Sequence, residues 1–125
     1  MTTKKKVVAP FIRRHSISQA ALNKIGACWS QQYKFRNIFE LSDRLTRIPI
    51  TAENVRIARN AGLSIEWLLT RVLTRKDFNA YYAKRQRLHR RHQSSLIMTY
   101  TQLNDAHCEL IAKTLREGWG KKDER

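Results

Sequence analysis

The densest group of side chains that could do chemistry lies at positions 84–92, which read Lys-Arg-Gln-Arg-Leu-His-Arg-Arg-His. This segment holds five Lys or Arg residues and two histidines, and no acidic residue occurs between Asp77 and Asp105. A helix through it would be charged on nearly every side. Such a surface repels itself and gains most from a polyanion, so the segment predicts contact with the phosphates of nucleic acid.

Zinc binding is the alternative chemistry for the histidines. His89 and His92 stand three residues apart, and Cys28, His107 and Cys108 are further ligand types for zinc. However, no cysteine pair has finger-like spacing, and the arginines around both histidines oppose a cation electrostatically. We therefore expect histidines that face phosphate or solvent, a His107 that is hydrogen-bonded in the core, and no metal or other cofactor.

Catalytic patterns are not recognisable in the chain. The sequence contains no nucleophile beside a base, no glycine-rich phosphate loop and no paired carboxylates at a catalytic spacing. We therefore expect a protein that is not an enzyme and that has no small-molecule substrate.

The overall charge agrees with a polyanionic partner. The chain has 125 residues and a formal net charge of +15, from 25 Lys and Arg against 10 Asp and Glu. Its hydrophobic content of 42% is too high for a wholly disordered basic protein, so the charge is expected on the surface of one folded domain. A solvated basic face that only aids solubility is the alternative, although smaller net charges already suffice for solubility.

The cellular compartment is expected to be the cytoplasm. The two cysteines lie far apart and among apolar neighbours, as buried free thiols in a reducing compartment do. No apolar stretch reaches the length of a membrane span, and the basic N-terminus lacks the apolar region of a secretory signal. We expect no membrane partner.

The elements that must position these residues are helices. Apolar spacings of three and four predict a mainly α fold, a compact bundle of four to five helices with at most one short strand near 46–50. The expected organisation is a flexible basic arm at 1–15, a single helical domain at 16–118 and a charged tail at 119–125. One long helix is expected at about 17–40, capped by Ser16 or Ser18, with Gly26 inside it.

Further caps divide the rest of the chain. Thr51 is expected to cap a helix that runs from 52 to 60 or 61, and Gly62 to end it. Ser64 is expected to cap the next helix, and Asp77 a further one. Residues 93–95 are a plausible interruption, after which an apolar stripe from 96 to about 117 predicts the last helix.

The aromatic residues divide between the core and the surface. Trp29 and Trp67 are expected in the core, whereas Trp119 follows the last helix and is expected as an exposed anchor for a partner. The tyrosines would stack on bases wherever they are exposed. They are Tyr33, Tyr81, Tyr82 and Tyr100, of which Tyr81 and Tyr82 are expected in the core or at its flank.

Residues 47–73 resemble DNA-binding motifs in two ways. First, the spacing of small and apolar residues is similar to that of a helix-turn-helix, in which two short helices cross closely around a tight turn. The residues that carry this resemblance are Ala58, Gly62, Leu63, Leu68 and Val72. The outward positions of the second helix would include Ile65, Trp67 and Leu69.

The second resemblance is to ribbon-helix-helix proteins. The stretch 47–50 reads Arg-Ile-Pro-Ile before a capped helix, and a second helix follows the turn at Gly62. In that family a short strand pairs with its twin in a dimer and enters the major groove. The resemblance therefore implies that Arg47 contacts a base or a phosphate and that the protein is a homodimer.

Taken together, these patterns predict a small nucleic-acid-binding protein that is driven by phosphate contacts, a regulatory or accessory factor. DNA and RNA remain open as the partner. The candidate binding residues are Lys84, Arg85, Arg87, His89, Arg90 and Arg91 in the basic segment, and Arg47, Arg56, Arg59, Arg75 and Lys76 outside it.

Two alternatives remain open. In size, charge and helicity the chain is similar to the small structural subunits of ribonucleoproteins such as CRISPR effector complexes, which act within a larger protein complex. Alternatively, it is a protein-interaction or inhibitor module that docks through Ile65, Trp67 and Leu69.

Overall fold

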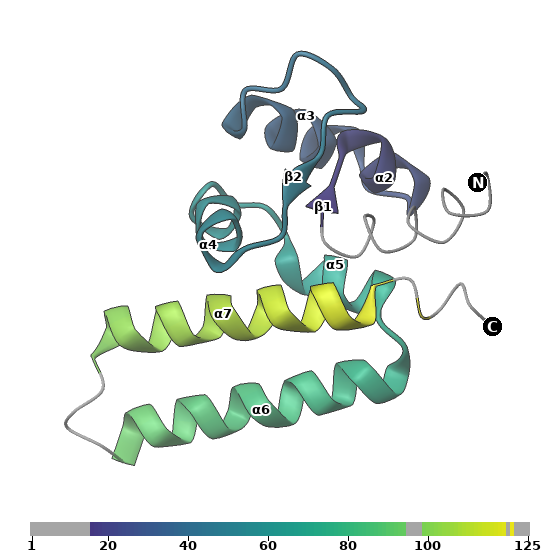
Figure 1. Ribbon diagram of the computed structural model, residues 1–125. Helices are drawn as coiled ribbons and strands as arrows, with labels where there is room; N and C mark the ends of the chain where they lie inside the picture. Colours follow the sequence, from purple (N-terminus) through teal and green to yellow (C-terminus); the bar gives the residue numbers. More distant parts are fainter. Residues whose placement is uncertain (1–15, 95–98, 120, 122–125) are drawn as a thin grey trace, which may run out of the picture.

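The structure is a computed structural model that describes residues 16–94, 99–119 and 121, most of which are helical (Figure 1). Its elements are β1 (Ser16–Ile17), α2 (Gln19–Lys24), α3 (Trp29–Ile38), β2 (Ile48–Pro49), α4 (Ala52–Asn60), α5 (Ile65–Val72), α6 (Arg75–Ser94) and α7 (Tyr100–Gly118). The predicted mainly α class is confirmed. The arm expected at 1–15 and most of the tail expected at 119–125 lie outside the described residues.

The long helix expected at 17–40 is wrong in its extent, because the chain forms two helices there. α2 begins after Ser18, whose side chain accepts a hydrogen bond from the backbone N–H of Ala21 at 3.1 Å. It ends at Lys24, and Gly26 follows with a φ of +92°, a left-handed conformation that a continuous helix cannot contain. Because of this break, the described residues contain six helices instead of the four to five expected.

A second strand also differs from the prediction of at most one. β1 pairs with β2 in antiparallel register, with Ser16 opposite Pro49 and Ile17 opposite Ile48. The strand expected near 46–50 is therefore present, and its partner comes from the same chain. This short ribbon joins the start of the described chain to the segment that leads into α4.

The helix pair around Gly62 is confirmed. Thr51 caps α4 by accepting a hydrogen bond from the N–H of Asn54 at 3.1 Å, and Gly62 lies two residues after the helix with a φ of +91°. Ser64 occupies the cap position of α5 without a capping bond from its side chain. Its backbone N–H donates instead to Gln31 Oε1 of α3 at 2.9 Å, which ties the corner to the N-terminal helices.

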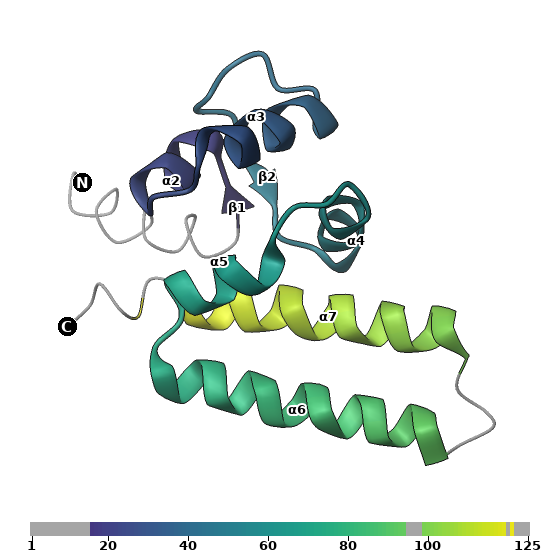
Figure 2. The same ribbon diagram turned by 180° about the vertical axis from the view of Figure 1, so that it is seen from behind.

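The two longest helices, α6 and α7, form an antiparallel hairpin on which the other elements rest (Figures 1 and 2). The first turn of α6 is capped by Thr74, whose hydroxyl accepts from the N–H of Asp77 at 3.1 Å, so the expected cap at Asp77 is wrong by three residues. Thr99 caps α7 in a capping box with Gln102. Leu96, where the last helix was expected to begin, lies outside the described residues.

The core lies where α4, α5 and α7 meet. Leu69, Ala112 and Ile111 are at most 2% exposed. Trp119 is 8% exposed and packs into this core, so the exposed anchor expected there is wrong. An apolar ring gains more from burial against α7 than from contact with water.

Two residues expected to be buried lie on the surface instead. Trp29 is 65% exposed, and Cys28 is also exposed. The helix break at Gly26 explains the exposure of both side chains, because it places Cys28 at the cap of α3 and Trp29 in the first turn of that helix. The other thiol, Cys108, is buried as expected.

Candidate nucleic-acid interface

The side chains of the basic segment 84–92 lie on different faces of helix α6. Lys84, Arg87, Leu88 and Arg91 recur at spacings of three and four and line one side of the helix, where it meets α7. Arg85 and His89 lie on the adjacent side and are partly buried, whereas Arg90 is exposed. The cations of the segment are therefore divided among a side that meets α7, a partly buried side and an exposed side.

A groove of about 410 Å³ runs along the first of these faces, between α6 and α7. We call it the hairpin groove. Lys84, Arg87, Leu88 and Arg91 of α6 line it together with Ala106, Glu109, Leu110, Lys113 and Arg116 of α7. Five cationic side chains from two helices thus surround one open groove, with Glu109 as the only acidic residue among those that line it.

Four of the five cations of the hairpin groove are exposed to solvent. Lys84, Arg87 and Lys113 are exposed and form no ion pair with any residue in the described ranges. Arg116 is partly buried and donates from one guanidinium nitrogen to the backbone oxygen of Ile50 at 2.8 Å, which fixes its position beside the groove. An arrangement of this kind concentrates positive potential where an anion can approach.

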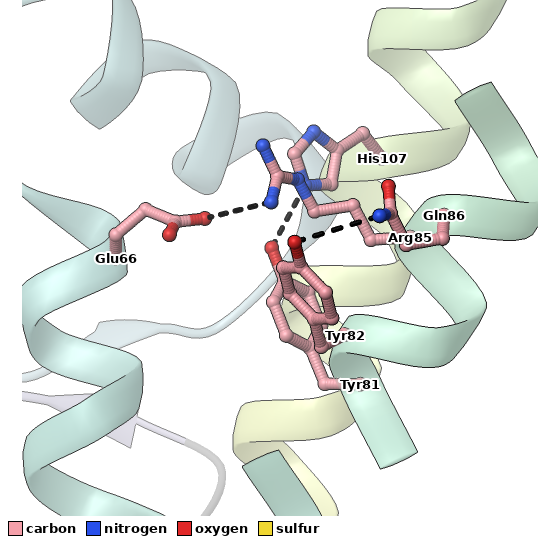
Figure 3. Close-up of polar contacts among 6 residues, drawn as sticks. All are labelled: Glu66, Tyr81, Tyr82, Arg85, Gln86 and His107. Carbon is pink, nitrogen blue, oxygen red and sulfur yellow. Dashed lines mark hydrogen bonds and ion pairs between the residues drawn. The ribbon is translucent and has the colours of Figure 1, made fainter. Parts of the chain in front are cut away.

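The side of α6 that carries Arg85 forms a polar cluster with α5 and α7 (Figure 3). Arg85 lies 4.0 Å from the carboxylate of Glu66 and stacks 5.7 Å above the ring of Tyr82. Tyr81 is 1% exposed, and its hydroxyl is 2.8 Å from His107 Nε2. Arg85 therefore contacts a residue of α5 and does not line the hairpin groove.

Burial controls the protonation of this cluster. Burial acts together with the positive charges of Arg59 and Arg85 and the nearby His89 to lower the pKa of His107 to about 4. Burial likewise raises the pKa of Tyr81. At neutral pH both side chains are therefore uncharged and form a neutral hydrogen bond. The expectation of a hydrogen-bonded core residue at His107 is confirmed.

The remaining candidate residues are not brought together. Arg59 donates to Asn104 Oδ1 at 3.1 Å and is partly buried between α4 and α7. Arg47 donates to the hydroxyl and the backbone oxygen of Ser16, at 2.6 and 2.9 Å. Arg56 lies exposed on α4, and Arg75 and Lys76 lie exposed at the start of α6, outside the lining of the groove.

Two groove residues, Lys113 and Arg116, were missed by the sequence reasoning. They stand three residues apart on α7, close to Glu109, Glu117 and a buried apolar stripe, where they look like ordinary surface charges. The antiparallel pairing of α6 with α7 is what brings them to the basic segment. Two long helices joined by a short connection would have been the signal for that pairing.

The corner between α4 and α5 does not present the surface that was expected. Leu69 is fully buried, and Ile65 and Trp67 are partly buried against the core. The exposed positions of α5 are Glu66, Thr70 and Arg71. The docking face expected at Ile65, Trp67 and Leu69 is therefore wrong for Leu69, which packs inside the protein, whereas Ile65 and Trp67 stay partly exposed.

The part of the chain that the structure describes contains neither a metal-binding cluster nor a membrane span. Within the described residues, His, Cys, Asp and Glu side chains do not gather in groups of three that could hold a metal ion. None of the helices in these ranges is long and apolar enough to cross a bilayer. Comparison of the chain with protein-family models, with curated proteins and with solved structures finds no match.

Proposed function

We propose that this chain is a small nucleic-acid-binding protein that holds phosphates in the hairpin groove. The observation that carries the proposal is the convergence of five cations from α6 and α7 on one groove with a single carboxylate. A guanidinium offers phosphate a planar fork of donors, and three of the five cations are arginines. A regulatory or accessory role, rather than catalysis, is part of the proposal.

The alternative of a basic face that only aids solubility explains this arrangement less well. Solubility depends on net charge and does not require cations from two separate helices to meet along one groove. Repulsion between them opposes the pairing of α6 with α7, and a bound polyanion would relieve it. The polar cluster on the adjacent side of α6 provides contacts from this helix to α5 and α7.

A charge-reversal experiment tests the site. The double variant Lys84→Glu, Arg87→Glu changes two exposed groove residues. It should weaken binding to labelled DNA and RNA oligonucleotides by at least about 100-fold at low salt, because two phosphate contacts are lost and two repulsive charges are added. Binding is followed by fluorescence anisotropy, and circular dichroism checks that the variant stays folded.

The matched control is Lys24→Glu, Arg44→Glu, which changes the net charge equally at two exposed residues of the N-terminal part. Its affinity should fall only slightly, through the long-range effect of net charge. Equal losses in the two variants would show that total charge, and not the hairpin groove, attracts the nucleic acid.

A further inference from the structure

Contacts between α6 and α7 fix how these two antiparallel helices are aligned along the hairpin groove. His107 of α7 lies opposite the middle of α6, because its Nε2 is 2.8 Å from the hydroxyl of Tyr81 and its ring centroid is 6.0 Å from that of His89. Where α6 ends and α7 begins, the ring centroids of His92 and Tyr100 are 4.9 Å apart. Each step along α7 towards its end therefore corresponds to a step along α6 back towards its beginning.

This alignment places the five groove cations in a staggered line and not in facing pairs. On α7, Lys113 and Arg116 lie beyond these contacts, level with about positions 76–82 of α6 and thus before Lys84. On α6, Lys84 is followed by Arg87 and Arg91 towards the opposite end of the groove. The order along the groove is therefore Arg116, Lys113, Lys84, Arg87 and Arg91.

The length of this line matches a short run of nucleotides. From Arg116 to Arg91 the cations span about 12 to 15 residues of helix, which rise about 1.5 Å each, so the line is about 20 Å long and neighbouring cations are about 5 Å apart on average. A nucleic acid strand carries one negative charge per nucleotide, and stacked nucleotides rise about 3.4 Å each. A somewhat extended strand of about five nucleotides thus brings one phosphate to each cation.

The line is also straight, since both of its walls are single helices that run straight in the two views (Figures 1 and 2). B-DNA completes a turn in about 10–10.5 base pairs, so each strand of a duplex turns by about 140° over four steps. The phosphates of a duplex strand would therefore leave the groove after two or three contacts. A single strand can straighten and follow the whole line.

We propose that one strand of nucleic acid lies along this line, with successive phosphates at Arg116, Lys113, Lys84, Arg87 and Arg91. The site is then about five nucleotides long. This inference rests on the proposed function and specifies the path and the length of its ligand. The contacts are to phosphates, so the line accepts any base sequence.

A series of strands tests the length of the site. Oligo(dT) strands with two to eight phosphates compete with a longer fluorescein-labelled strand for the full-length protein. The slope of log affinity against log salt should steepen by about 0.7 for each added phosphate and stay constant beyond about five. An oligo(U) series should reach its plateau at the same length, and its affinity relative to oligo(dT) identifies RNA or DNA as the source of the strand.

A matched pair of variants tests the order of the cations. Lys84 is the central cation of the line and Lys113 lies nearer one end, and both are exposed lysines. Every placement of a three-phosphate strand on five sites uses the central one, so Lys84→Gln should weaken binding of that strand about tenfold or more. Lys113→Gln leaves one placement intact and should cost at most about threefold. Strands with five or more phosphates should lose similar affinity in both variants.

The outcomes separate the two proposals. Failure of every strand to bind at low salt would overturn the proposed function itself. A slope that keeps growing through eight phosphates or stops at two, or equal losses of the three-phosphate strand in the two variants, would overturn only the path along the line. Tighter binding of a duplex of the same length would do the same. Circular dichroism checks that both variants stay folded.

Discussion

The hydrogen bond between Tyr81 and His107 shows how single residues link α6 to α7. Both side chains, Tyr81 from α6 and His107 from α7, are buried, with an O–N distance of 2.8 Å. A charged imidazole there would face Arg59, Arg85 and His89 in a poorly solvated space. The neutral form of His107 is therefore required for a stable hairpin.

This requirement predicts a loss of stability in mild acid. The pKa of His107 is lowered to about 4 from its ordinary value of 6.5, so the unfolded chain binds the additional proton between these pH values. The stabilisation from neutral His107 is complete above about pH 6.5 and is lost as the pH falls towards 4. The free energy of unfolding, measured with urea, should fall by up to about 1.4 kcal/mol per pH unit in this window.

The control for this prediction is His107→Gln, which cannot titrate but can still form a hydrogen bond with Tyr81. It should be less stable than wild type at pH 7 and should lose less stability on acidification. If wild type and variant respond equally to pH, another group is responsible for the acid sensitivity.

At the scale of elements, several caps and the helix end at Gly62 could be predicted from the sequence, whereas the cap of α6 and the break at Gly26 could not. Ser18, Thr51 and Gly62 act at the positions where their types and spacing placed them, because a cap depends on its immediate neighbours. The break at Gly26 was missed, since an isolated glycine is also tolerated inside a helix. That single error also misplaced Trp29, which the break moves to the surface.

The end of α7 provides a prediction about helix packing. Gly118 is the last residue of this helix, where alanine is ordinarily more favourable than glycine. A Cβ at this position would lie 2.6 Å from Cδ2 of Leu73, a side chain that is 1% exposed in the core. Gly118→Ala should therefore destabilise the protein by about 1–3 kcal/mol in urea unfolding.

A compensating substitution tests the cause. Gly118→Ala combined with Leu73→Val shortens the clashing side chain, and the double variant should lose less stability than the sum of the two single variants. Strict additivity would mean that the added methyl group does not meet Leu73.

At the scale of the whole molecule, the charge excess could be predicted, but its three-dimensional arrangement could not. The basic segment of α6 is evident in the sequence, and it does form one wall of the candidate site. Lys113 and Arg116 join it only through the antiparallel pairing of α6 and α7. Conversely, Arg59 and Arg85 look like surface cations in the sequence, whereas the fold uses them in contacts between helices.

The salt dependence of binding tests the central claim most directly. Affinity for a labelled single strand would be measured over a range of salt concentrations for wild type and for Arg87→Gln. If all five groove cations contact phosphates, the plot of log affinity against log salt should have a slope of about −3.5, and Arg87→Gln should make it shallower by about 0.7. A slope near zero, or an identical slope in the variant, would contradict phosphate binding in the hairpin groove.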